Sequence, residues 1–151
     1  MADRPFGNTL VTQVGIVVKD IEATARAWSQ LLGLPMSTIR VTNPVEQAQT
    51  EYRGERTPAR ARLAFFPLGQ VTIELIEPLG GPSTWKEHLD ARGESVHHIA
   101  FEVQGMKNTL AYLAASNVPL LQKGEYTGGH YAYVDSANAL GVVLELLEND
   151  R

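Results

Sequence analysis

The stretch Val96-His-His-Ile-Ala-Phe-Glu-Val103 decides the fold of this chain, because its pattern occurs once before. Gln13-Val-Gly-Ile-Val-Val18 matches His98-Ile-Ala-Phe-Glu-Val103 at an offset of 85 residues. In both stretches apolar residues alternate with other residues, which is the pattern of a half-buried strand. The repeat predicts that the chain is built from two similar modules.

A second pair of stretches supports the duplication. Val71-Thr-Ile-Glu-Leu-Ile76 matches Val142-Val-Leu-Glu-Leu-Leu147 at an offset of 71 residues, again with strand alternation. Each repeat also places a helix after its first strand. We expect these helices from Ile21 to Leu32, where Asp20 can provide the cap, and from Met106 to Ser116.

The remaining strands complete a strand-helix-strand-strand-strand order in each half. We expect them at Ala61–Phe66, Gln70–Ile76, Val118–Leu121, Tyr131–Val134 and Gly141–Leu147, with a long loop or loosely ordered strand edge from Thr42 to Pro58. The chain is therefore predicted to be one α+β domain over residues 1–151. Module 1 (about 8–78), a connector (79–94) and module 2 (about 95–150) would form a curved mixed sheet around a cup.

Strand alternation also predicts which side chains face the cup. In four strands one apolar set is expected to pack against the helix, so the polar residue between its members points the other way. These polar residues are Gln13, Glu74, His98 and Glu145, and His97 is not expected to share the face of His98. Equivalent positions of the two modules thus supply Gln and His from the first strands, and Glu and Glu from the last.

This set of side chains points to a metal site. Two carboxylates, one imidazole and one amide oxygen are hard or borderline ligands, with water completing an octahedron. We predict one divalent metal ion (Co, Ni, Zn, Mn or Mg) on Gln13, Glu74, His98 and Glu145.

The composition excludes several other functions. The chain has no Cys, so disulfides, thiolate metal sites and Cys nucleophiles are excluded. Its formal net charge is −4 and its basic residues are scattered, so we expect no nucleic-acid partner. No apolar run approaches the roughly 20 residues that span a bilayer, so we expect no membrane partner and a cytoplasmic location.

At these residues the chain resembles the vicinal oxygen chelate superfamily, which includes glyoxalase I, methylmalonyl-CoA epimerase, extradiol dioxygenases and antibiotic-resistance proteins. The resemblance covers nearly the whole chain and rests on Gln13-Val-Gly-Ile-Val-Val-Lys-Asp-Ile21, Ile73-Glu-Leu-Ile-Glu-Pro78, His97-His-Ile-Ala-Phe-Glu-Val103 and Gly141-Val-Val-Leu-Glu-Leu-Leu147. The second and third stretches are typical of methylmalonyl-CoA epimerase and its relatives, which usually carry His in place of Gln13. The ligand set Gln, Glu, His, Glu is instead similar to that of eukaryotic glyoxalase I.

The resemblance implies a metal-dependent enzyme: an epimerase, racemase or isomerase that moves a proton next to a carbonyl through an enolate stabilised by the metal. It implies Glu145 as the catalytic base, because the Glu of the last strand is a base in both resembled families. Inversion of a stereocentre needs proton exchange on both faces, so Glu74 is the candidate for the second carrier. Gln13 and His98 would remain as structural ligands.

Three further residues are candidates for substrate contact. By the resemblance, Arg62 aligns with a third-strand position from which some epimerases supply a second base. An Arg cannot be a base, but it could pair with a substrate carboxylate or phosphate, or simply face solvent. His130 and Tyr131 precede a strand at a place where such folds close over a ligand. By the same resemblance we expect a small carbonyl or thioester substrate and a homodimer.

Two other functions stay open. A glyoxalase I-type lactoylglutathione lyase would use the same four ligands. A non-catalytic ligand-binding or antibiotic-resistance protein belongs to a different class. The single His in the ligand set counts against an extradiol dioxygenase, which needs two His and one carboxylate for Fe(II).

Overall fold

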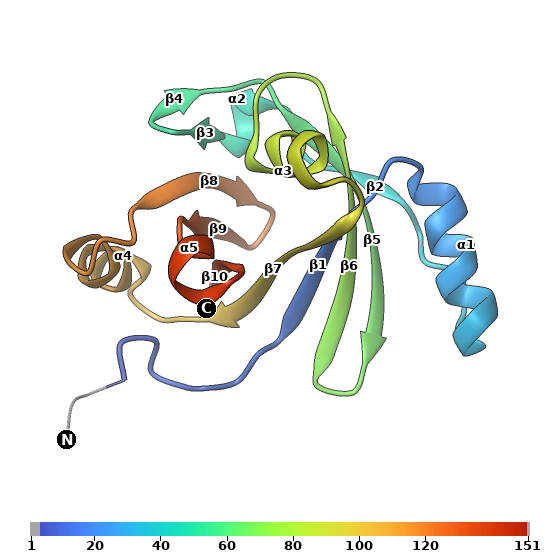
Figure 1. The fold of residues 1–151 in the computed structure, drawn as a ribbon, viewed down its shortest axis with the longest axis horizontal. Helices are drawn as coiled ribbons and strands as arrows, with labels where there is room; N and C mark the ends of the chain where they lie inside the picture. Colours follow the sequence, from blue (N-terminus) through green and yellow to red (C-terminus); the bar gives the residue numbers. More distant parts are fainter. Residues whose placement is uncertain (1–3, 151) are drawn as a thin grey trace.

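The computed structural model describes residues 4–150 of the chain. Its strands form one mixed sheet in the order β2-β5-β6-β1-β7-β10-β9-β8-β3-β4, which curls into an open half-barrel (Figure 1). The strands are β1 (Gln13–Val17), β2 (Arg40–Val41), β3 (Glu51–Tyr52), β4 (Glu55–Arg56), β5 (Arg60–Leu68), β6 (Val71–Leu79), β7 (Ser95–Glu102), β8 (Leu120–Tyr126), β9 (Gly129–Val134) and β10 (Val143–Asn149). The helices are α1 (Ile21–Leu32), α2 (Val45–Ala48), α3 (Thr84–Arg92), α4 (Met106–Ala115) and α5 (Ala137–Leu140). No helix within residues 4–150 is both long and apolar enough to cross a membrane.

The two halves of the sheet repeat one another. β1 runs parallel to β6, and β7 runs parallel to β10. β1 and β7 pair antiparallel and join the two halves. Reading outward from this joint, one half has the order β1-β6-β5-β2 and the other the order β7-β10-β9-β8. The predicted fold class, an α+β fold with a curved mixed sheet, is therefore confirmed.

Helices α1 and α4 lie on the outer side of the curved sheet, one against each half (Figure 1). Ile21 and Ala25 of α1 are buried against apolar residues of β1, β5 and β6. Met106 and Leu113 of α4 are buried against apolar residues of β9 and β10. Because these apolar sets face the helices, the alternating polar residues of the same strands face the inside of the half-barrel.

Helix α3 packs over part of the inner face. Its Trp85 belongs to a buried cluster with Val17, Ile76 and Tyr133, which come from three different strands. Ser83 caps this helix: its hydroxyl accepts a hydrogen bond from the Lys86 N–H in the first turn. The connector between the modules is thus part of the core.

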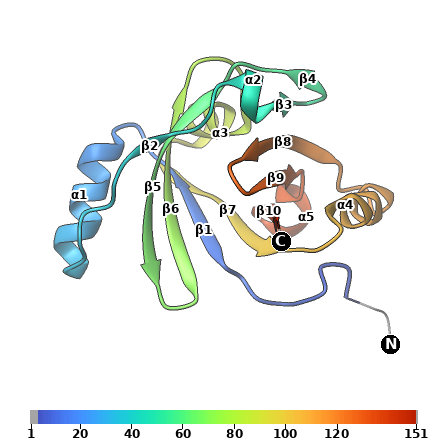
Figure 2. The same ribbon diagram turned by 180° about the vertical axis from the view of Figure 1, so that it is seen from behind.

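The segment 42–58 is more ordered than predicted. It forms α2, β3 and β4, and β3 pairs with β8, so a segment of the first module extends the edge of the second half (Figure 2). Tyr52 and Arg53 bind Glu87 of α3, with Arg53 Nη2 2.9 Å from Glu87 Oε1. These contacts join residues that are distant in sequence, which periodicity along one strand does not report.

Several strand boundaries also differ from prediction, and β8 runs from Leu120 to Tyr126 where Val118–Leu121 is expected. The β5–β6 hairpin continues through Pro67 and turns at Gly69 and Gln70, where Gly69 has the positive φ that this tight turn requires. In the second half β9 begins at Gly129. His130 therefore lies within a strand together with Tyr131, and not in a loop before one.

Candidate metal centre

Four side chains from neighbouring strands meet inside the half-barrel. They are Gln13 on β1, Glu74 on β6, His98 on β7 and Glu145 on β10, the residues that the sequence singles out. The His98 Nε2 atom lies 3.0 Å from Gln13 Oε1, 3.1 Å from Glu145 Oε1 and 3.4 Å from Glu74 Oε1. The structure thus brings the predicted set together around one ring nitrogen.

The spacing of these atoms fits a divalent ion. Ligand–metal distances of roughly 2.1 Å place two ligand atoms roughly 3.0 Å apart at a right angle, and roughly 3.4 Å apart at a tetrahedral angle. Glu74, His98 and Glu145 are buried, and one ligand atom of each lies within 4.8 Å of the others. Two buried carboxylates need compensating positive charge, which a divalent ion at this point would supply.

Gly15 makes room for the ring of His98. The two residues are cross-strand partners on β1 and β7. A Cβ atom on residue 15 would lie 2.0 Å from the His98 Cε1 atom, which is far inside van der Waals contact. Sequence reasoning missed this residue, although a glycine inside a strand is the signal of such a close approach.

Strand β7 contains a bulge that brings two adjacent histidines together. Gly15 pairs with His98 but Ile16 pairs with Val96, so His97 is an extra residue in β7. A bulge of this kind interrupts the alternation of side chains between the two faces. His97 Nδ1 consequently lies 2.8 Å from His98 Nδ1. The prediction that His97 does not share the face of His98 is wrong for this reason.

The charges around His98 favour positive charge on its ring. Burial by itself would lower the pKa of His98, but the carboxylates of Glu145 and Glu74 raise it to about 9. Burial also raises the pKa of Glu74, against the opposing effect of its hydrogen bond with His98. His97 differs, because burial and the neighbouring His98 and His88 lower its pKa well below the ordinary value of 6.5. The pair therefore combines a neutral imidazole with one that attracts a proton or a metal ion.

The site opens onto a cavity of about 450 Å³, a size that suits a small organic molecule. Gln13, Glu74 and Glu145 line this cavity, and the fully buried His98 lies behind them. The walls are mainly apolar and aromatic, and they include Leu63, Phe65, Trp85, Tyr131, Tyr133 and Leu147. Among the described lining residues Arg40 is the one cation.

Residues 12–134, most of the chain, match a family described as the glyoxalase/bleomycin resistance protein/dioxygenase superfamily. The chain belongs to this superfamily. The match spans both modules and includes Gln13, Glu74 and His98, while Glu145 lies beyond its end. The members of such a superfamily share a fold and differ in chemistry, so the reaction has to be argued from the site.

This superfamily member is similar to other proteins in sequence and in structure. The uncharacterized protein YqjC of Bacillus subtilis (strain 168) is 28% identical over 138 residues, which is 89% of each chain. Methylmalonyl-CoA epimerase from Mycobacterium tuberculosis has a TM-score of 0.66 at 21% identity, and the alignment covers 100% of this chain and 93% of that one. A methylmalonyl-CoA epimerase solved in complex with methylmalonyl-CoA and NH4+ has a TM-score of 0.63 at 21% identity, covering 93% of this chain and 94% of that one. At these identities the solved structures show a shared fold.

Two of the three candidate substrate contacts do not line the cavity of this superfamily member. Arg62 pairs with Glu22 at 2.8 Å and with Glu77 at 3.4 Å. His130 Nε2 lies 2.9 Å from Glu148 Oε1. The partners of both residues are carboxylates of the protein itself, so both side chains make contacts within the protein and outside the cavity.

Tyr131 does line the cavity, and a chain of hydrogen bonds orients its hydroxyl. The Thr84 N–H donates to Gln122 Oε1 at 2.8 Å, and Gln122 Nε2 donates to the Tyr131 hydroxyl at 3.0 Å. Because a backbone N–H can only donate, Gln122 must turn its NH2 group toward Tyr131. The hydrogen of the Tyr131 hydroxyl is then available to a molecule in the cavity. Sequence reasoning missed Thr84 and Gln122, which carry no local signal.

Proposed function

We propose that this protein is a metal-dependent enzyme that moves a proton at a carbon next to a carbonyl group, as an epimerase, racemase or isomerase. The observation that supports this most is the approach of Gln13, Glu74 and Glu145 to His98 Nε2 beside a mainly apolar cavity. Binding of a ligand alone would not require two buried carboxylates at the cavity wall.

Each of the four residues has a part in this proposal. Together they would hold one divalent ion, and Gln13 and His98 would serve as ligands throughout. When bound, the ion supplies a Lewis acid that stabilises negative charge on a carbonyl oxygen. Glu74 and Glu145 are carboxylates beside the cavity, so they are the groups that can also accept and return a proton.

The two carboxylates come to the site from different sides. Their strands β6 and β10 flank the central β1–β7 pair. In an epimerisation Glu145, ionised at the start, would remove the proton from one face of the α-carbon, and Glu74, protonated at the start, would give its proton to the other face. Proton exchange of both groups with water would then restore the starting state. The α-carbon loses and regains one hydrogen, so the product differs from the substrate only in configuration.

Tyr131 would donate a hydrogen bond to an oxygen atom of the substrate. Tyr131→Phe keeps the ring on the cavity wall and removes this donor. We expect turnover to fall about 100-fold, the cost of losing one donor to a developing negative charge. Elemental analysis should show unchanged metal content, because Tyr131 is not a ligand. An unchanged turnover rate would contradict the role of Tyr131.

The substrate would be a small carbonyl compound or a thioester. A thioester is supported by the similar epimerase that holds methylmalonyl-CoA. A cavity of about 450 Å³ accommodates the acyl group, so the nucleotide part of a coenzyme A thioester would extend outside it. Exposed Arg40 lines the cavity and could meet an anionic part of the substrate there.

Hydrogen exchange tests the proposed reaction. Metal-loaded protein is incubated with methylmalonyl-CoA in D2O, and the α-proton is followed by NMR. We expect loss of the α-proton signal with the natural protein and no loss with Glu145→Gln, which should still bind some metal. Glu125→Gln is the matched control, because Glu125 lines the same cavity without belonging to the ligand set. If no 2-methyl thioester, hemithioacetal or α-acidic ketone exchanges its proton, the proposed reaction is wrong.

The donor types Gln, Glu, His and Glu also favour a second candidate, a glyoxalase I-type lactoylglutathione lyase. Turnover of the hemithioacetal of methylglyoxal and glutathione would identify that activity. Tight ligand binding without turnover, and without sensitivity to a chelator, would instead identify a non-catalytic binding protein. The same preparations can be used for all three measurements.

A further inference from the structure

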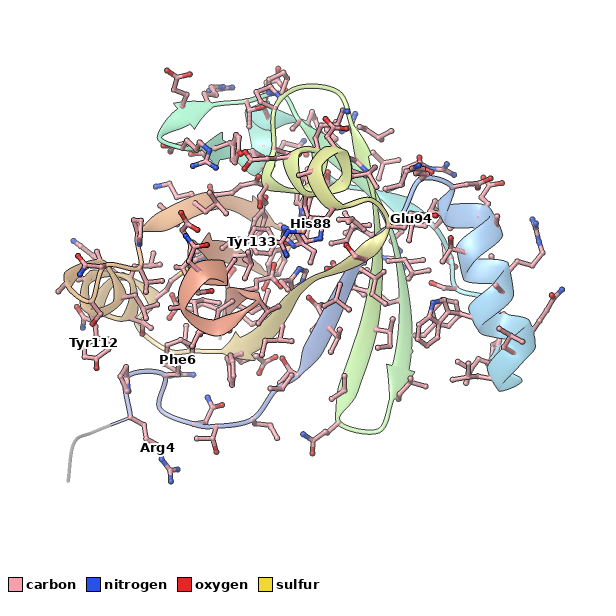
Figure 3. The ribbon with its side chains drawn as sticks, viewed as in Figure 1. Arg4, Phe6, His88, Glu94, Tyr112 and Tyr133 are labelled. Carbon is pink, nitrogen blue, oxygen red and sulfur yellow. The ribbon has the colours of Figure 1, made fainter. Side chains whose placement is uncertain are left out.

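The ring of His97 is buried directly behind His98, with 1% of the residue exposed. Its Nδ1 atom lies 2.8 Å from His98 Nδ1, and its Nε2 atom lies 3.0 Å from Thr84 Oγ1. His88 of α3 and Tyr133 of β9, labelled in Figure 3, pack edge to face against the ring. Both ring nitrogens of His97 therefore have a partner, and the aromatic neighbours limit rotation of the ring.

The hydrogens in this chain of contacts follow once His98 binds a metal ion. If His98 is to bind a metal through Nε2, its ring hydrogen must be on Nδ1. Two N–H groups cannot face each other at 2.8 Å, so the Nδ1 atom of His97 must then be the acceptor. A neutral His97 carries its own hydrogen on Nε2, from which it donates to Thr84 Oγ1.

We propose that His97 is a positioning residue, whose acceptor nitrogen holds His98 in the tautomer and orientation that direct the Nε2 lone pair toward a divalent ion. The opposite arrangement would put a hydrogen on His98 Nε2, in front of the oxygen atoms of Gln13, Glu74 and Glu145, and would block the metal. This inference rests on the proposed function for the metal itself, while the hydrogen-bond chain rests on the geometry.

The last residue in this chain of hydrogen bonds, Thr84, is held in place by helix α3. Thr84 is the first residue of α3, and its backbone N–H is bound to the fully buried Gln122. The hydroxyl that accepts from His97 therefore belongs to a helix rather than a loop. Partners of this kind behind a metal-binding imidazole typically change metal affinity roughly 10–100-fold.

Three substitutions at position 97 distinguish the effect of the hydrogen-bond acceptor from the effect of the packing of the ring. His97→Asn places an amide oxygen near the position of Nδ1, but leaves the outer half of the ring's space empty. His97→Phe fills the space and offers no acceptor. His97→Gln places its amide near the position of Nε2, so it can reach Thr84 but not His98.

Binding of Co²⁺, measured by competition with a chelator and by visible absorption, distinguishes these variants. We expect His97→Asn to bind nearly as tightly as the natural protein, and the Phe and Gln variants to bind roughly 10–100-fold more weakly. The thermal stability of the metal-free proteins should follow a different order, with His97→Asn least stable because of its cavity. If His97 acted only through its packing, the variants would rank in the same order in Co²⁺ affinity and in thermal stability.

The natural protein allows a test that does not require any variant to fold. Nitrogen-15 NMR of the zinc-loaded protein should show hydrogens on His98 Nδ1 and His97 Nε2. A hydrogen on His97 Nδ1, or equal Co²⁺ affinity of the natural protein and His97→Phe, would overturn this inference alone. Failure of the natural protein to bind Co²⁺ or Zn²⁺ would overturn the proposed function, and the role of His97 with it.

Discussion

The ring of His98 rests on the backbone of Gly15, and this contact decides where the ring can point. A Cβ atom at position 15 would lie 2.0 Å from Cε1, 2.4 Å from Nδ1 and 2.6 Å from Nε2 of that ring. Because His98 is fully buried in a close-packed interior, its ring has little space into which it could move. A single methyl group at position 15 should therefore act on the metal site and not only on stability.

Gly15→Ala tests this contact. We expect the added methyl group to displace the His98 ring, so that Nε2 no longer meets the oxygens of Gln13, Glu74 and Glu145. Elemental analysis should then find far less than the one divalent ion per chain that we expect for the natural protein.

Gly124→Ala is the matched control for this substitution. A Cβ atom on residue 124 would lie 2.8 Å from Tyr131 Cε1 and does not approach His98. This variant should keep its metal and lose turnover, because only Tyr131 is displaced. Equal metal content in Gly15→Ala and the natural protein would show that the clearance at Gly15 is not required.

At the scale of elements, a carboxylate from a strand that carries a ligand binds the N-terminus of each outer helix, and α1 has it in addition to its own predicted cap, Asp20. Glu77 Oε1 on β6 accepts a hydrogen bond of 3.0 Å from the Ile21 N–H. Glu148 on β10 accepts hydrogen bonds from the N–H groups of Gly105 and Met106. Carboxylates at this end of a helix satisfy free N–H groups and interact favourably with the helix dipole. Each cap thus ties the outer helix to the strand that supplies a Glu to the inner face.

Arg62 and His130 hold these two capping carboxylates from equivalent places. Arg62 is the cross-strand partner of Glu77, and His130 is the cross-strand partner of Glu148. Glu77 also forms an ion pair with Arg62, and Glu148 a hydrogen bond with His130. We therefore assign Arg62 and His130 to the support of the helices, and of the three contacts expected from the sequence only Tyr131 remains a candidate.

Glu148→Gln should lower the free energy of unfolding by about 1 kcal/mol at pH 7. Burial acts to raise the pKa of Glu148, but the N–H groups of Gly105 and Met106 and the His130 side chain lower it below the ordinary value of 4.5. A lowered pKa stabilises the fold above pH 4.5, and this contribution is lost as the pH falls through the pKa of the folded state. Urea unfolding at pH values from 7 down to about 3.5 measures the free energy of unfolding of the natural protein and of Glu148→Gln. The difference between the two free energies should therefore shrink as the pH falls.

The exposed Glu55 offers a control for this charge effect. Glu55→Gln removes the same charge without removing a helix cap, so its unfolding free energy should stay close to that of the natural protein. If the free energies of unfolding of Glu148→Gln and the natural protein differ by the same amount at every pH, the charge of Glu148 is not the cause.

At the scale of the whole molecule, the candidate ligands come from both halves of the chain. Gln13 and Glu74 belong to the first module, and His98 and Glu145 belong to the second. The halves meet at the antiparallel pair of β1 and β7, next to these side chains. An ion bound by all four would therefore hold the two modules together, and it would bind the folded chain far better than the unfolded one.

Removal of metal should consequently lower thermal stability. At a free metal concentration of about 100 times the dissociation constant, the folded state gains about 2.7 kcal/mol. For a chain of this length that corresponds to a rise in Tm of roughly 5–10 °C over the chelator-treated protein. Scanning calorimetry with and without a chelator measures the difference. The same metal should shift the Tm of Gly15→Ala much less, and equal shifts would show that the ion binds elsewhere.

The sequence by itself determined the two-module sheet and the inward direction of Gln13, Glu74, His98 and Glu145. The physical reason is local: burial of an apolar set against a helix forces the alternating residues of the same strand to the other face. The duplication also predicted that these four side chains meet, since equivalent positions of two paired modules approach one another. Helices α1 and α4 followed from the same periodicity.

Only the tertiary structure decided the features that depend on pairing between distant segments. The bulge opposite Gly15 puts His97 behind His98, and β3 pairs with β8 across the two modules. The partners of Arg62 and His130 likewise follow from the register of β5 with β6 and of β9 with β10. Alternation along one strand reports which face a side chain takes, but not which residue of another strand lies beside it.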